Sequence, residues 1–171
     1  MTGLALRSPS EEATRGVGRA LGGALLPGLT VLLTGDLGAG KTVLVRGVGD
    51  ALGARGVRSP SFTLVNEYPT SRLLLFHADL YRLDEGGADA LGLEEYVGSP
   101  DAALLVEWPE RWARAPQENV LDITIAALDE EARLLTFRAA GELAERALGA
   151  LAASGAEVPG LVRVESGEGR R

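Results

Sequence analysis

The sequence predicts an α/β fold: a three-layer sandwich with a mixed central sheet, ending in a β-hairpin and a helix. Short apolar stretches typical of buried strands recur along the chain, at 29–34, 73–79 and 102–106. Stretches with helical spacing of apolar residues lie before and after the first of them. That first strand runs through a glycine-rich loop directly into a helix, which is a common unit of α/β proteins.

Length and composition indicate one globular domain, which we place at 1–153. The stretch 154–171 is rich in glycine and charge, and we expect a poorly ordered tail there. The chain has no cysteine, no evident signal peptide and no long apolar run, so we expect a cytoplasmic protein without a membrane segment. The net charge of −7 argues against a DNA-binding or general nucleic-acid-binding role.

The first predicted helix runs from about residue 8 to residue 26. Ser8 is the expected N-cap, Pro9 suits the first helical position, and Glu11 stands where a capping box needs an acid. Pro27 and Gly28 end the helix.

The loop after the first strand has the form G-x-x-x-x-G-K-T, a motif that cradles nucleotide phosphates. Its residues are Gly35, Asp36, Leu37, Gly38, Ala39, Gly40, Lys41 and Thr42. Small residues let backbone N–H groups approach a phosphate, Lys41 supplies positive charge, and Thr42 supplies a hydroxyl ligand for Mg²⁺. A helix at 43–52 follows, with Gly53 as its C-cap. This phosphate loop (P-loop, residues 35–42) predicts a P-loop NTPase-like fold and a nucleotide site.

Two acids stand at the ends of later apolar strands. A hairpin is predicted from 64–68 and 73–79, and Asp79 ends its second strand, which is the Walker B arrangement for Mg²⁺. Glu107 ends the strand at 102–106, and we expect it to share the metal with Asp79. We assign Lys41, Asp79 and Glu107 to catalysis.

Hydroxyl groups crowd the loop after the P-loop helix. Ser59 and Thr63 could sense a γ-phosphate or Mg²⁺, but an ordinary turn stabilised by local hydrogen bonds is equally compatible with this pattern. His77, the single histidine, is expected to pack or hydrogen-bond in its strand rather than act as a base. Further along, we expect a helical stretch at 87–97, a hairpin from 120–127 and 133–139, and a helix at 142–153.

Four stretches together resemble the TsaE family, formerly called YjeE: the P-loop, Ser59–Val65, His77–Leu83 and Val106–Pro109. The resemblance covers about residues 8 to 140. It implies an ATPase that uses ATP and Mg²⁺. It also implies action with the TsaB–TsaD pair, which transfers a threonylcarbamoyl group to adenosine 37 of tRNA, so that tRNA is engaged through that complex. Because phosphoryl transfer depends on positioning and charge stabilisation, we expect an incomplete site to turn over slowly alone.

The resemblance also implies roles for particular residues. Ser59 and Thr63 fall in a loop resembling switch I. Glu11 and Arg133 match regions that the family uses near the nucleotide.

Three alternative functions compete with this one on the residues alone. A small-molecule kinase of the P-loop class would need an arginine-bearing lid, and Arg111 and Arg114 are the only close arginine pair after the two acids. A GTPase would need an Asn-Lys-x-Asp guanine reader, which the chain lacks because Lys41 is its single lysine. A purely structural nucleotide-binding subunit would bind without hydrolysis.

Overall fold

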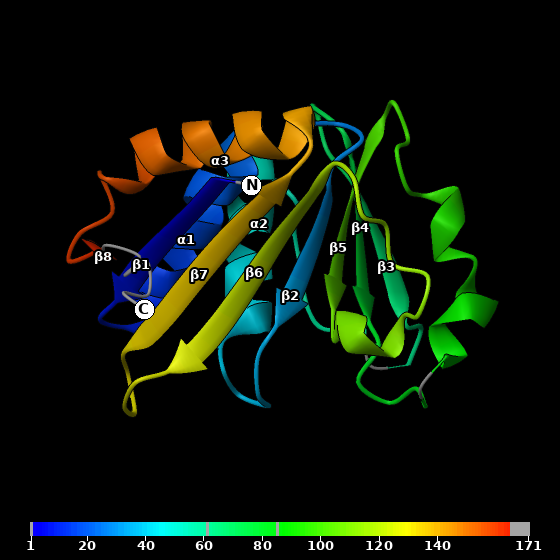
Figure 1. The fold of residues 1–171 in the computed structure, drawn as a ribbon, viewed down its shortest axis with the longest axis horizontal. Coiled ribbons are helices and arrows are strands. Elements are labelled where there is room, and N and C mark those ends of the chain that lie inside the picture. The colour runs from blue at the N-terminus through cyan, green and yellow to red at the C-terminus, as the bar shows by residue number, and fades with distance from the viewer. Residues whose placement is uncertain (1, 61, 85, 165–171) are drawn as a thin grey trace, which may run out of the picture.

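The computed structural model describes residues 2–60, 62–84 and 86–164. Its strands form one mixed sheet in the order β3-β4-β5-β2-β6-β7-β1-β8 (Figure 1). The strands are β1 (Thr2–Ser8), β2 (Thr30–Thr34), β3 (Val65–Pro69), β4 (Leu74–Asp79), β5 (Ala102–Glu107), β6 (Val120–Ala127), β7 (Arg133–Ala140) and β8 (Val162–Val164). The predicted mixed sheet, the first hairpin (β3–β4) and the C-terminal hairpin (β6–β7) are therefore confirmed.

Helices cover one face of this sheet. They are α1 (Glu11–Ala24), α2 (Lys41–Leu52) and α3 (Glu142–Gly155). Val31 and Leu105 of the sheet share a buried apolar cluster with Leu44 of α2 and Leu148 of α3. These helices and the sheet make two of the three predicted layers.

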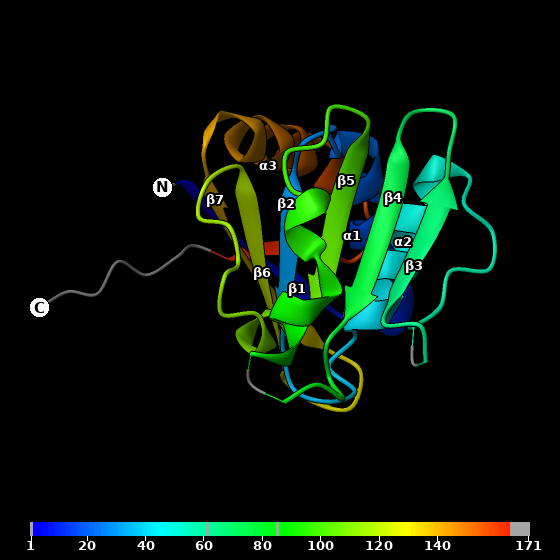
Figure 2. The same ribbon diagram turned by 90° about the vertical axis from the view of Figure 1, so that its right-hand side faces the viewer.

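The third layer is built from short 3₁₀ segments, which lie in front of β5 and β2 in Figure 2. They are η1 (Gly87–Leu91), η2 (Leu93–Glu95) and η3 (Pro109–Arg111). Phe76 and Leu104 of the sheet bury their side chains with Leu93 on this side. The helical stretch expected at 87–97 is present as two 3₁₀ segments rather than one continuous helix, because Gly92 adopts the left-handed conformation and separates η1 from η2.

Four strands, β4, β5, β2 and β6, run parallel. Their carboxyl ends meet at the lower edge of the sheet in Figure 1. The P-loop leaves β2 at this edge, and Asp79 and Glu107 end β4 and β5 there. Ligands of open α/β sheets bind outside the carboxyl ends of the strands, so this topology gathers the predicted site residues.

The N-terminal prediction is wrong in two respects. Residues 2–8 form β1, which pairs antiparallel with β7. Ser8 belongs to this strand, and its buried hydroxyl lies 2.8 Å from the Thr14 hydroxyl. Ser10 is the N-cap instead, because its side chain accepts from the Ala13 N–H at 3.1 Å. Ser8 is therefore the last residue of a strand, and the helix begins two residues later than expected.

The C-terminal stretch also contains order that composition did not predict. Helix α3 extends to Gly155, and residues 162–164 form β8, antiparallel to β1. A three-residue exposed strand carries little sequence signal, and its partner β1 was itself not predicted. Residues 165–171 of the expected tail lie outside the described residues.

Helices α1 and α2 cross at two glycines, which lets their backbones touch. A Cβ atom added to Gly47 would lie 2.1 Å from the Arg15 carbonyl oxygen and 2.8 Å from the Gly18 Cα. Both neighbours are backbone atoms, so neither can yield by changing a rotamer. We expect Gly47→Ala to lower the free energy of unfolding by about 1–3 kcal/mol, measured by urea denaturation.

Gly149 of α3 is the matched control for this prediction. It also lies inside a helix, but a Cβ there meets no atom within 4 Å. Gly149→Ala should raise the free energy of unfolding by about 0.5–1 kcal/mol, because alanine restricts the unfolded chain without clashing. Equal effects of the two substitutions would show that the helix crossing does not require glycine.

Candidate functional site

The P-loop borders a cavity of about 390 Å³. Gly40, the N-cap of α2, has φ of +112°, a conformation that strains any residue with a side chain. This turn lets Lys41 begin the helix directly behind the loop. Residues 37–43 line one side of the cavity, and the other side is lined by Ser59, Leu64, Asp79, Tyr81, Arg82 and Glu107.

Lys41 is a buried cation at this cavity, with 5% of its surface exposed. Its Nζ donates to the carbonyl oxygens of Gly35 and Asp36 and lies 4.3 Å from the centre of the Trp108 ring. Burial lowers the pKa of Lys41, while the nearby charges of Glu107 and Asp79 act in the opposite direction. Among the described residues no carboxylate reaches Lys41 as an ion pair, so a bound anion is well suited to balance its charge.

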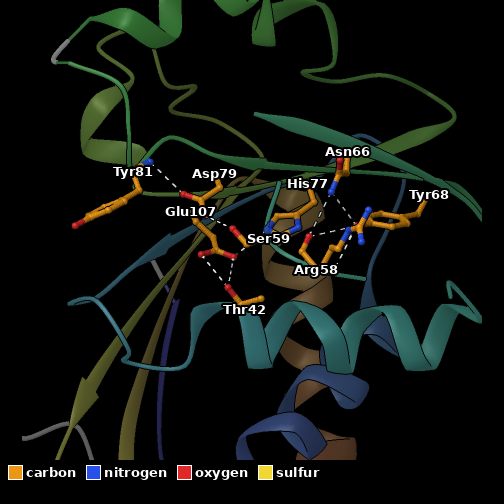
Figure 3. A network of polar contacts seen from close by, with 9 residues as sticks. All are labelled: Thr42, Arg58, Ser59, Asn66, Tyr68, His77, Asp79, Tyr81 and Glu107. Carbon is orange, nitrogen blue, oxygen red and sulfur yellow. Dashed lines mark hydrogen bonds and ion pairs between the residues drawn. The ribbon is translucent and has the colours of Figure 1, made fainter. Parts of the chain in front are cut away.

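The two predicted acids lie side by side, because Asp79 and Glu107 are register partners at the ends of β4 and β5. Glu107 is buried, and its carboxylate oxygens accept from the Thr42 hydroxyl at 3.1 and 3.3 Å (Figure 3). Asp79 accepts from the Ser59 hydroxyl and, at 3.0 Å, from the Tyr81 backbone N–H. The structure thus brings the P-loop hydroxyl and both acids together.

These oxygens fit a magnesium ion that is bound together with a nucleotide. Thr42, Asp79 and Glu107 all line the cavity. In the described part of the chain, no three His, Cys, Asp or Glu side chains gather as a metal site of their own. Mg²⁺ typically takes one or two carboxylates and completes its octahedron with phosphate oxygens and water, so a donor set of this size suits it.

The loop before β3 reaches the same site through Ser59. Tyr68 and Asn66 of β3 hydrogen-bond to the Arg58 backbone, which holds the loop against the sheet (Figure 3). Ser59 lines the cavity. Thr63 does not: its exposed hydroxyl donates to the Asn66 side chain at 2.9 Å. Of the two predicted loop residues, only Ser59 contacts a site acid in this structure.

Glu11 and Arg133 lie on the other side of the P-loop, in a hollow of about 190 Å³. The Arg133 Nε donates to the Ala39 carbonyl oxygen at 2.9 Å, so β7 supports the loop backbone. Its Nη1 donates to carbonyl oxygens in the turn before β7. Both residues border the loop, and neither lines the larger cavity.

Sequence reasoning did not identify the partners of two residues in this site, Trp108 and His77. Trp108 covers the Lys41 ammonium, and its left-handed backbone (φ of +60°) turns the chain directly after Glu107. His77 Nε2 lies 2.9 Å from a Glu107 oxygen. The alternation of β4 carried a usable signal, because positions 77 and 79 point to the same face of a strand.

Comparisons with known proteins agree with this geometry. The family model described as "Threonylcarbamoyl adenosine biosynthesis protein TsaE" matches residues 8–135. A relative from Synechocystis, named tRNA threonylcarbamoyladenosine biosynthesis protein TsaE, is 45% identical over 64% of this chain and 73% of its own length. A Bacillus subtilis relative of the same name is 36% identical over 82% of this chain and 89% of its own.

A solved structure has the same fold. The crystal structure of Bacillus subtilis YdiB superimposes with a TM-score of 0.74 at 32% identity, covering 89% of this chain and 95% of that one. No helix in the described ranges of the present chain is long and apolar enough to cross a membrane.

Proposed function

This chain belongs to the TsaE family of threonylcarbamoyl adenosine biosynthesis proteins, and from that membership we propose that it is the Mg²⁺-dependent ATPase of tRNA threonylcarbamoyladenosine formation. In this proposal it works with the TsaB–TsaD complex, which performs the transfer to adenosine 37, and it contacts tRNA only through that complex.

One observation carries the ATPase proposal. The buried Lys41 is followed by Thr42, whose hydroxyl donates a hydrogen bond to the buried Glu107 carboxylate. In the proposed state, backbone N–H groups of the P-loop and Lys41 bind the β- and γ-phosphates. Thr42, Asp79 and Glu107 would hold Mg²⁺. When bound, the ion supplies neutralisation of charge on the phosphate oxygens.

Exposed apolar side chains around the cavity support the proposal of a protein partner. Leu37 of the P-loop is 72% exposed and Phe62 is 90% exposed. Phe62 lies under the guanidinium of Arg82, which lines the cavity, at 5.3 Å. Such exposed apolar side chains at the rim of a polar site are available for contact with a partner. A partner bound there would sense the nucleotide state.

The kinase alternative has less support. Arg111 belongs to the arginine pair considered for a lid, and its Nη1 donates to the Leu83 carbonyl oxygen at 2.8 Å. Neither Arg111 nor Arg114 lines the cavity. A side chain already engaged with the backbone is poorly placed to close over an acceptor substrate.

The test measures ATP turnover of the full chain with and without the TsaB and TsaD homologues of its own organism. Phosphoryl transfer depends on positioning and charge stabilisation, so a site that awaits a partner should be slow. We expect weak hydrolysis alone and a clear increase with the complex, together with ATP-dependent co-purification. Equal turnover with and without the partners would refute the regulatory part of the proposal.

A further inference from the structure

His77 lies beneath the two site acids on the helix-covered face of the sheet. It is the only histidine in the chain, and none of its side chain is exposed. It precedes Asp79 by two residues in β4, so both side chains point to the same face. Figure 3 shows its ring turned toward Glu107 of the neighbouring strand.

Of the two imidazole nitrogens of His77, only Nε2 has a hydrogen-bond partner among the described residues. Nε2 lies 2.9 Å from Glu107 Oε1, and because a carboxylate accepts, Nε2 is the nitrogen that carries the hydrogen. None of the residues that the structure describes gives the buried Nδ1 a hydrogen-bond partner. Leu75 of the same strand and Leu105, the register partner in β5, are fully buried and apolar. The register partner in β3 is Asn66, whose amide bonds to Thr63, Arg58 and Tyr68.

The unpartnered nitrogen costs stability, whereas the hydrogen bond from Nε2 stabilises the buried Glu107 carboxylate. A leucine at position 77 would remove both effects. Among the described residues, the only polar contact of His77 is with Glu107, and the same carboxylate contacts the Thr42 hydroxyl. The influence of His77 on the site therefore passes through that acid.

We propose that His77 is a positioning residue for Glu107. Its N–H fixes the rotation of the carboxylate, whose terminal torsion is otherwise broad, so that both oxygens face Thr42. Side chains that bind metal ions are commonly oriented by a hydrogen bond with a neighbouring residue that does not itself contact the metal. This inference rests on the proposed function, because it concerns the Mg²⁺ site.

Two substitutions separate the hydrogen bond from simple packing. In His77→Gln the amide nitrogen extends about as far from the backbone as Nε2 of the imidazole, so it can donate to Glu107. In His77→Asn the amide reaches only to the position of Nδ1 and cannot. Both side chains are uncharged amides, so Asn is the matched control for Gln. His77→Leu removes the donor with an apolar side chain.

The experiment titrates Mg²⁺ against the binding of a fluorescent ADP analogue and repeats the binding measurement in EDTA. We expect His77→Asn and His77→Leu to raise the half-saturating Mg²⁺ concentration by about 10- to 100-fold. We expect His77→Gln to stay close to the wild-type value. Binding in EDTA should be the same for all four proteins, because the donor acts only on the metal site.

Several outcomes would overturn the inference. Equal shifts of the half-saturating Mg²⁺ concentration in His77→Asn and His77→Gln would show that a donor able to reach Glu107 is not required. Lower melting temperatures with unchanged Mg²⁺ dependence would show a purely structural role. A further loss when His77→Asn is added to Glu107→Gln would show that His77 acts through another group. If wild-type binding ignores Mg²⁺, the proposed metal site itself fails; if wild-type responds and the variants match it, only this inference fails.

Discussion

Lys41→Met is expected to reduce ATP hydrolysis by about 100- to 1000-fold, the usual effect of removing one preorganised charge donor from a reaction centre. Lys41 is the only lysine of the chain and the only cation of the P-loop. Methionine keeps an unbranched stem beneath Trp108, so the packing of the loop is preserved while the ammonium is lost. Steady-state release of inorganic phosphate measures the effect.

The substitution should leave the empty protein intact. Lys41→Met removes the hydrogen bonds from Nζ to the Gly35 and Asp36 carbonyl oxygens, but it also removes the cost of burying the ammonium, which lowers the pKa of Lys41. These effects oppose each other, so the melting temperature without nucleotide should stay close to that of wild type, whereas the rise in melting temperature on adding Mg²⁺ and ATP should vanish. Stabilisation by nucleotide in Lys41→Met equal to that in wild type would contradict the role of Lys41.

Arg46→Met provides the matched control. Arg46 lies on the same helix, α2, but it is exposed and does not line the cavity. Its replacement removes the same charge from the same element. We expect hydrolysis and nucleotide-dependent stabilisation to remain near wild type, which would separate a local effect of Lys41 from a general effect of net charge.

The centre of the sheet and the P-loop could be predicted from sequence because their signals are local. Strand β2, the glycines of the loop and helix α2 are adjacent in the chain, and the chemistry of the motif is encoded in eight residues. Asp79 and Glu107 were predictable as well, since each ends an apolar run. Parallel strands then place such acids at one edge without further information.

The features that were missed depend on partners distant in sequence. Strand β1 is stabilised by β7, more than a hundred residues later, and β8 by β1. Ser8 was predicted to cap a helix but lies in β1, because the pairing of β1 with the distant β7 decides the structure of this segment. The contact of Trp108 with Lys41 depends on a left-handed backbone at Trp108, which no local pattern predicts for a tryptophan.

Glu107→Gln tests the other half of the site, and we expect it to lower Mg²⁺-dependent hydrolysis by about 100-fold or more. A metal ion supplies several kcal/mol of charge stabilisation, and each 1.36 kcal/mol changes a rate tenfold. Glutamine keeps the size of the side chain and one oxygen that can accept from Thr42 or His77. The fold should therefore persist while the charge that attracts the ion is lost.

The measurement is the rate of hydrolysis as a function of Mg²⁺ concentration. If Glu107 binds the ion, the variant should need far more Mg²⁺, and adding Asp79→Asn should remove the remaining dependence. Glu110→Gln is the control, because Glu110 is an exposed acid three residues away that does not line the cavity. Wild-type turnover in the Asp79, Glu107 double variant would exclude these carboxylates as the metal ligands and leave the buried Thr42–Glu107 contact with a structural role alone.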